Sequence, residues 1–200
     1  MKRMVIMKTN NQKALQNTLL TAILSAAALV IFFIEFPLIP SSHLKMDFSD
    51  IPAIIAGVLI NPLAGVVVEL VKNLLEMLFK GLGTTMGFGN LMNFLVGVAF
   101  VVPFSVIIRA VKEPVKGFFL ASAAAAISML AVGFFGNYLV TPAYFEVFVG
   151  VEIDGAQALG YAVAATGFNA LKSAILIGIM LPVMKFALPP LKKIVDKRGR

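Results

Sequence analysis

Residues Ala14–Ile34 read ALQNTLLTAILSAAALVIFFI, a run of 21 residues without a charged side chain. Because an α-helix rises about 1.5 Å per residue, a helix of this length crosses the roughly 30 Å hydrocarbon core of a bilayer. The run is too long for the apolar segment of a cleaved signal peptide, which has about 7–15 residues. We therefore expect a first membrane-spanning helix that is retained.

The rest of the 200-residue chain is similarly apolar. Hydrophobic residues make up 60% and charged residues 14%, with a mean hydropathy of +0.94, whereas a soluble domain is about half apolar and about a quarter charged. A chain of this length supplies about six spans of roughly twenty residues each. The sequence predicts an all-α integral membrane protein, a single bundle of six transmembrane helices forming one domain over residues 1–200.

The five later spans are expected at residues 51–60, 63–79, 91–108, 115–140 and 161–188. The first of these is short because Asn61-Pro62 interrupts it, and ten helical residues reach only about 15 Å. Either the connector before it folds inward at membrane depth, or the bilayer is locally thin. Irregular backbone at that depth is tolerated where it faces protein or water, so an inward-folding connector suits a binding cavity.

The distribution of charge predicts the orientation. Of the 17 Lys and Arg residues, four precede the first span, three lie in the connector Arg109–Lys116, and six lie between Lys185 and Arg200. The acids Glu35, Asp47, Asp50, Glu146, Glu152 and Asp154 fall in the opposite connectors. By the positive-inside rule, both termini are cytoplasmic, with short basic tails at residues 1–13 and 189–200. This clustering at membrane connectors argues against nucleic-acid binding despite the net charge of +7.

Residues for catalysis are missing from the sequence. There is no cysteine, and the single histidine, His43, has no serine or cysteine motif around it and no second histidine with which to bind a metal. No Walker lysine is present, so ATP hydrolysis must come from another chain if the protein takes part in active transport. We predict a protein that is not an enzyme and has no resident metal or cofactor.

Two polar residues in the last span are the best candidates for ligand binding. Asn169 and Lys172 are three residues apart, hence on one helical face. An amide that donates and accepts, next to an ammonium group, suits a flat heterocycle with an imide-like edge. The competing interpretation is helix-to-helix hydrogen bonding with a lysine that extends towards the interface.

Further polar and aromatic residues gather at the expected outer ends of the spans. They are Asn90, Asn93, Asn137, Tyr138, Tyr144, Phe48 and Phe88. Aromatic faces pack on flat ring ligands, although aromatic residues also form the membrane-interface belt.

Charged side chains also occur inside the third span. Glu69, Lys72 and Glu76 have i,i+3 and i,i+4 spacing, and we expect them to neutralise one another. The same spacing would also allow a proton or ion relay.

Two alanines in the first span are spaced for helix contact. Ala22 and Ala26 are four residues apart, and small residues at this spacing let another helix approach closely in lipid. The contact is either with a partner protein or within the bundle.

Several segments together resemble the riboflavin-binding S components of energy-coupling-factor (ECF) vitamin transporters. They are Phe36-Pro37, Leu44–Pro52, Asn61–Gly65, Val68–Leu75, Gly87–Asn93, Asn137-Tyr138 with Pro142 and Tyr144, and Phe168-Asn169 with Lys172. The combination covers nearly the whole chain and is specific, although each piece alone is weak.

This resemblance implies a multi-pass subunit in a prokaryotic cell membrane that captures riboflavin from outside. Its partners would be a transmembrane coupling subunit, which Ala22 and Ala26 would face, and two ATPase subunits. The vitamin would lie between the first connector and the outer halves of the last three spans. The expected ligand contacts are His43, Leu44, Lys45, Met46, Asp47, Phe48, Asn90, Asn137, Tyr144, Asn169 and Lys172.

The sequence departs from the family pattern at two positions of the first connector. His43 stands where relatives often have tyrosine, and Lys45 replaces a small polar residue. The added basic residue near the mouth of the site would admit FMN as well as riboflavin.

Three further functions stay open at this point: an S component for another vitamin, a small membrane enzyme, and a stand-alone secondary carrier that uses Glu69 and Lys72.

Overall fold

The computed structural model describes residues 2–37, 45–82, 85–191 and 193, with side chains for 11–35, 46–82, 85–191 and 193. Two of the expected ligand contacts, His43 and Leu44, lie outside the described residues. Lys45 is described by its backbone alone.

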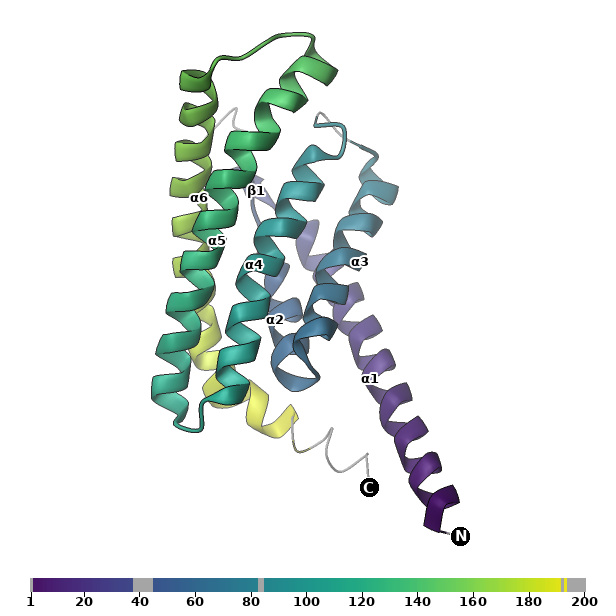
Figure 1. The fold of residues 1–200 in the computed structure, drawn as a ribbon. Helices are drawn as coiled ribbons and strands as arrows, with labels where there is room; N and C mark the ends of the chain where they lie inside the picture. The colour runs from purple at the N-terminus through teal and green to yellow at the C-terminus, as the bar shows by residue number, and fades with distance from the viewer. Residues whose placement is uncertain (1, 38–44, 83–84, 192, 194–200) are drawn as a thin grey trace.

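Six α-helices form most of this part of the chain (Figure 1). They are α1 (Lys2–Phe32), α2 (Asp50–Leu59), α3 (Pro62–Lys80), α4 (Phe88–Ala110), α5 (Pro114–Tyr144) and α6 (Gly155–Pro182). Short π-helical segments continue two of them, η1 (Phe145–Val149) after α5 and η2 (Val183–Ala187) after α6. The two shortest elements are the strands β1 (Phe36–Pro37) and β2 (Lys45–Met46), which pair antiparallel with Phe36 opposite Met46.

Four helical segments of the described chain are long and apolar enough to cross a membrane. They are Asn11–Phe32, Phe88–Ala110, Pro114–Val149 and Gly155–Leu191. The short helix α2 has only ten residues, and α3 carries charged side chains within its length. The helical membrane fold is therefore present, while the count of six spans stays a prediction.

The break between α2 and α3 occurs where the sequence predicts it. The side chain of Asn61 caps α3, its oxygen accepting from the backbone N–H of Ala64 at 2.8 Å, and Pro62 occupies the first turn. Proline fits this position because its missing N–H would have no helical partner there.

The connector expected at residues 141–160 is largely helical instead. α5 continues through Pro142, and η1 extends it to Val149. α6 already begins at Gly155, where Asp154 and Gln157 form a reciprocal capping box, the Asp154 carboxylate accepting from Gln157 N–H at 2.7 Å. Capping by the acidic residue explains why a polar segment starts a helix here rather than a loop.

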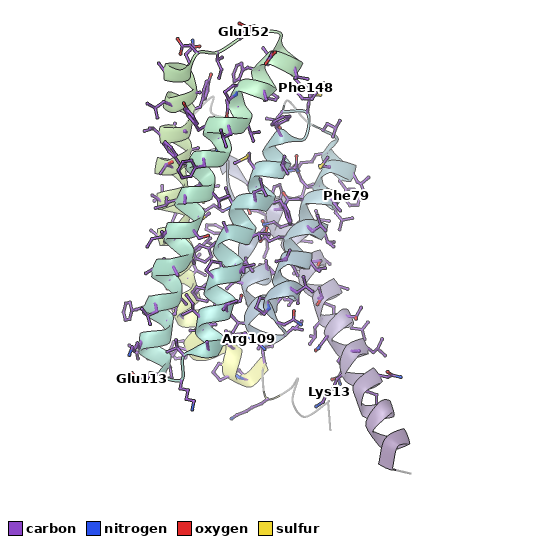
Figure 2. All side chains as sticks on the ribbon, in the orientation of Figure 1. Lys13, Phe79, Arg109, Glu113, Phe148 and Glu152 are labelled. Carbon is purple, nitrogen blue, oxygen red and sulfur yellow. The ribbon has the colours of Figure 1, made fainter. Side chains whose placement is uncertain are left out.

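The helices pack in a defined order. α4 lies between α3 and α5, α6 packs on the far side of α5, and α1 packs against α2 and α3. In Figure 1 the N-terminal half of α1 diverges from the bundle, and the chain starts and α6 ends at the same, lower end. Lys13, Arg109 and Glu113 mark that end in Figure 2, with Phe148 and Glu152 at the opposite end.

A lysine of α3 links that helix to the C-terminal end of α1. Lys80 Nζ lies 3.1 Å from Glu35 Oε1. It also lies 5.1 Å from the ring centroid of Phe32 and 5.0 Å from that of Phe33. Ion pairing and cation–π attraction both act on this ammonium group. The helix is therefore attached at one end, while its N-terminal half diverges from the bundle (Figure 1).

The apolar core of the described chain is formed by residues from all six helices. Phe100 and Phe104 stack at 5.9 Å, and the ring of Phe104 meets Phe118 edge-on at 6.0 Å. α2 and α3 approach so closely that a Cβ at Gly65 would lie 2.8 Å from the carbonyl oxygen of Ala53. Such close packing holds the start of α2 rigidly beside α3 and α4.

Candidate functional site

Five charged side chains are buried together where α2, α3 and α6 meet. We call this group the ion cluster; its members are Asp47, Asp50, Glu69, Lys72 and Lys172. Asp50, Glu69 and Lys72 are wholly buried, and Lys172 and Asp47 are 3% and 4% exposed. Three carboxylates and two ammonium groups leave a formal excess of one negative charge.

The ammonium group of Lys172 reaches across from α6. Its Nζ lies 2.8 Å from Asp50 Oδ2, 3.5 Å from Asp47 Oδ2 and 3.3 Å from Asn93 Oδ1. Residues from the first connector, α2 and α4 therefore converge on one side chain of α6. Lys172 has hydrogen-bonding capacity in a water-poor environment, where such bonds are strong.

The ammonium group of Lys72 occupies the other side of Asp50. It is ion-paired with Asp50 Oδ1, lies 2.8 Å from Glu69 Oε2, and donates to Ser49 Oγ at 2.9 Å. The two oxygens of Asp50 thus face two different lysines. Ser49 also donates its backbone N–H to Asp47 Oδ1 at 2.8 Å, which links the connector to the same network.

The expected charge ladder on α3 forms only in part. Glu69 and Lys72 pair as predicted, but Glu76 pairs with Lys80, 3.6 Å away, and accepts a hydrogen bond from Asn90. The reason is that Asp50 and Ser49 draw Lys72 into the interior. A glycine makes room for Glu69 there, since a Cβ at Gly97 would lie 2.5 Å from Glu69 Oε2.

The two predicted amides of α5 and α6 lie close to the same glycine. Asn137 Nδ2 donates to the carbonyl oxygen of Gly133 at 2.7 Å. The amide of Asn169 packs on Gly133 so tightly that a Cβ there would collide with it. Asn169 is 5% exposed. Both amides therefore occupy the α5–α6 interface, and Asn169 shares the buried face of α6 with Lys172.

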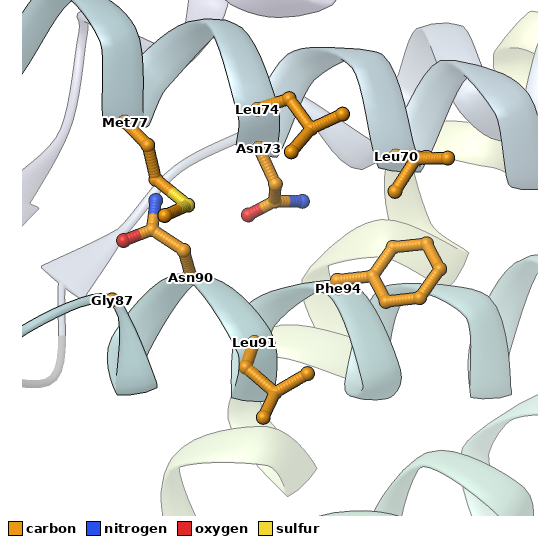
Figure 3. A pocket seen from close by; sticks show the side chains of 8 residues that line it. All are labelled: Leu70, Asn73, Leu74, Met77, Gly87, Asn90, Leu91 and Phe94. Carbon is orange, nitrogen blue, oxygen red and sulfur yellow. The ribbon is translucent and has the colours of Figure 1, made fainter. Parts of the chain in front are cut away.

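Asn90 lies elsewhere. It lines a cavity of about 240 Å³ between α3 and α4, together with Leu70, Asn73, Leu74, Met77, Gly87, Leu91 and Phe94. Figure 3 shows Asn90 and Met77 pointing towards each other between the two helices.

The residue of α4 that reaches Lys172 is Asn93. The sequence marks Asn93 as a polar insertion, but it is absent from the expected ligand contacts. A polar side chain in an apolar helix is the signal that could have placed it there.

The remaining predicted contacts are divided between two places. Met46 is 1% exposed and lies beside the ion cluster in sequence, with Phe48 half-buried. Tyr144 belongs instead to an aromatic group with Phe88, 5.2 Å away, and Phe148, 5.9 Å away. This group joins the start of α4 to the end of α5.

The two alanines of α1 face outwards. Ala22 and Ala26 are exposed, as are Leu19 and Ile23 beside them, at 54% and 63%. Packing within the described bundle therefore does not cover this face of α1.

Within the described ranges no group of three histidine, cysteine or acidic side chains is placed to hold a metal ion. The site offers buried donors and acceptors on rigid helices, which suits recognition of a ligand with a planar polar edge.

Comparison with known proteins identifies the family. The sequence profile described as "ECF transporter, substrate-specific component" matches residues 16–185. A solved structure titled "Structure and mechanism of the S component of a bacterial ECF transporter" has a TM-score of 0.66 and 26% identity, covering 88% of this chain and 98% of that chain.

Two curated relatives are similar in sequence. The riboflavin transporter FmnP of Bacillus subtilis (strain 168) is 34% identical over 126 residues, 62% of this chain and 65% of the relative. The riboflavin transporter RibU of Staphylococcus aureus (strain TCH60) is 33% identical over 132 residues, 64% and 66% of the two chains. The match thus spans slightly less than two thirds of each relative's length. Because the profile covers most of the chain, the protein belongs to the substrate-specific components of ECF transporters, a transporter family and not an enzyme family.

Proposed function

We propose that the protein is the riboflavin-binding S component of an ECF-type importer. It captures the vitamin on the outer side of a prokaryotic plasma membrane and delivers it through association with an ATPase-driven module. The observation that carries the proposal is the buried pair Asn169 and Lys172 on one face of α6, with Asp47 of the first connector 3.5 Å from Lys172. The names of the relatives, riboflavin transporters, support the choice of ligand.

The chemistry of the site fits this ligand. The isoalloxazine ring is flat and has an edge that alternates carbonyl oxygens with a ring N–H. Lys172 would donate to a carbonyl oxygen, and Asn169 would both donate and accept. Met46 and Phe48 would supply apolar surface against the ring. A buried amide and ammonium group discriminate strongly against ligands that leave them unpaired.

Two features of the sequence support a proposal for the energy source and the partners. The chain has no Walker motif, so uphill uptake requires ATPase subunits in other chains. The exposed face of α1 around Ala22 and Ala26 would contact the transmembrane coupling subunit, because small residues allow close helix approach in lipid. In this arrangement six helices enter the membrane, and both termini lie in the cytoplasm.

An absorption spectrum of the freshly purified protein tests the proposal. We expect co-purified flavin, visible as yellow absorbance that is released on unfolding, and no hydrolysis of flavin or ATP by the isolated chain. Chromatography of the released flavin separates riboflavin from FMN. A folded preparation that neither contains flavin nor takes it up on addition contradicts the proposal.

A further inference from the structure

The ion cluster is where α6 meets the first half of the chain. α6 packs along α5, and its contacts with α2 are few. Lys172 and Asp47, which form one of the links to the first half, are 125 residues apart in sequence. The position of Lys172 therefore depends on α2 and the connector before it, and not only on its own helix.

Stability alone does not account for five buried charges at this point. Removing charged groups from water costs several kcal/mol per ion, and replacing buried ion pairs by apolar residues is often neutral or stabilising. What ion pairs do supply is geometry, since each pair fixes the relative placement of two side chains. The relevant geometry here is that of the ammonium group of Lys172.

Asp50 has a distinct place in the cluster. Among the described residues, it is the carboxylate within ion-pair distance of both lysines, with Oδ1 facing Lys72 and Oδ2 lying 2.8 Å from Lys172 Nζ. Glu69 is equally buried, but it pairs with Lys72 and not with Lys172. The first turn of α2 fixes the backbone of Asp50, and Lys72 fixes one of its oxygens.

We propose that Asp50 is a positioning residue, which holds the ammonium group of Lys172 where it meets the planar edge of the ligand. Lys72 is the second member of this support, because it orients the carboxylate of Asp50. The inference rests on the proposed function, since it assigns Lys172 to ligand contact. Ligand affinity then depends on a side chain of α2 that does not itself touch the ligand.

Two isosteric variants of the full-length protein in detergent, Asp50→Asn and Glu69→Gln, test this role. Each replaces one wholly buried carboxyl group of the ion cluster by an amide of the same shape. The two changes are therefore matched in size and burial, and they differ in contact with Lys172. With riboflavin as the probe, we expect Asp50→Asn to raise Kd at least roughly tenfold. For Glu69→Gln we expect a change below about threefold. Equal losses in both variants overturn the proposal, because they would report the loss of any carboxyl group from the cluster and not the position of Lys172.

A double-mutant cycle with Lys172→Met shows whether Asp50 acts through Lys172. We expect Asp50→Asn to have little further effect on Kd in the Lys172→Met background, whereas a general structural role would give additive losses.

Should Asp50→Asn fail to fold, Asp50→Glu is the second variant, because it keeps the carboxyl group and displaces it by one methylene. Weaker binding with unchanged melting of the ligand-free protein supports the proposal, and wild-type affinity overturns it.

The same titrations separate this inference from the proposed function. If the wild-type protein does not bind riboflavin, the proposed function fails. If the wild-type protein binds and Lys172→Met weakens binding while Asp50→Asn does not, the positioning role alone fails.

Discussion

Lys172 lies on the apolar helix α6, but its side chain is surrounded by polar groups. Its neighbours on α6, Leu171 and Ala174, are exposed on the outer face of the helix, while its own side chain is 3% exposed. The ammonium group can remain charged there because Asp47 and Asp50 face it. The ammonium group has three N–H donors and faces three oxygens, so in the proposed complex a ligand oxygen would replace one of these partners. The ammonium group is already removed from water, so binding would add little desolvation cost.

Replacing Lys172 by methionine is expected to weaken riboflavin binding by roughly 1.5–3 kcal/mol, typical of a hydrogen bond to a charged group. Titration of the purified variant measures the change. Lys80→Met is the matched control, because Lys80 also pairs with two carboxylates, and these lie outside the ion cluster. We expect the control to lower the melting temperature without changing affinity. Unchanged affinity in Lys172→Met, with a lower melting temperature, would make Lys172 a structural residue.

At this scale the polar residues are predictable from the sequence, but their partners are not. The i,i+3 spacing places Asn169 and Lys172 on one face, and both are buried as that face requires. The contact between Asp50 and Lys172 joins residues far apart in the chain, and no local pattern encodes it. The sequence also does not predict whether Asn90 or Asn93 faces Lys172. The two residues lie less than one helical turn apart, and the packing of α4 against α3 decides which of them turns towards α6.

At the scale of the helices, the α5–α6 interface depends on a glycine. Gly133 leaves the space in which the amide of Asn169 lies, and its carbonyl oxygen accepts from Asn137. A side chain at this position would push the amide out of the interface. Helices that meet through small residues can bring polar groups close together in a bundle.

Gly133→Ala is therefore expected to reduce riboflavin affinity at least roughly tenfold if Asn169 contacts the ligand. The loss occurs even though alanine favours a helix by about 1 kcal/mol over glycine. Gly178→Ala in α6 is the control, because a Cβ there meets no atom within 4 Å. Titration of both variants compares them. Wild-type affinity in Gly133→Ala would mean that Asn169 can move without consequence, and would remove it from the site.

Helix boundaries are predictable where proline and asparagine determine them, and less so elsewhere. Asn61-Pro62 ends one helix and caps the next as expected. The expectation of a loop after residue 140 is wrong, although the segment contains Pro142 and acidic residues. The proline is accommodated inside the last turn of α5, and Asp154 serves as a helix cap. The two-residue strand pair has no signal of its own in sequence, because it depends on the two ends of the connector meeting.

At the scale of the whole molecule, the ligand-binding groups and the outward face of α1 are separate. Ala22 and Ala26 are exposed on a helix whose C-terminal end is linked to α3 through Lys80. Asn169 and Lys172 are instead buried inside the bundle, at 5% and 3% exposed. If the proposed roles are right, substitutions on the exposed face of α1 should change docking of a partner without changing capture of the ligand.

Ala22→Trp or Ala26→Trp is expected to abolish ATP-driven riboflavin uptake in cells or proteoliposomes that contain the complete transporter. Binding to the isolated subunit should persist, because the added bulk prevents close helix contact without reaching the ligand groups. Ala123→Trp is the matched control, since Ala123 is an exposed alanine on α5. Loss of binding in the α1 variants would indicate packing within the bundle. Full uptake would indicate that this face of α1 contacts lipid alone.

The membrane class and the helical bundle are predictable from composition, because a chain with 60% hydrophobic residues has too few polar groups to cover a soluble surface. The number of spans is less directly encoded. α2 is short and α3 is charged, so each would enter the membrane only if its neighbours shield its polar groups from lipid. Such protection is a property of the assembled bundle.

The most direct test of the central claim is isothermal titration of the detergent-solubilised full chain with riboflavin. The account predicts saturable binding of one riboflavin per chain, weakened by Lys172→Met and unchanged by Lys80→Met. A monodisperse protein that melts cooperatively yet shows neither heat of binding nor quenching of flavin fluorescence would contradict it.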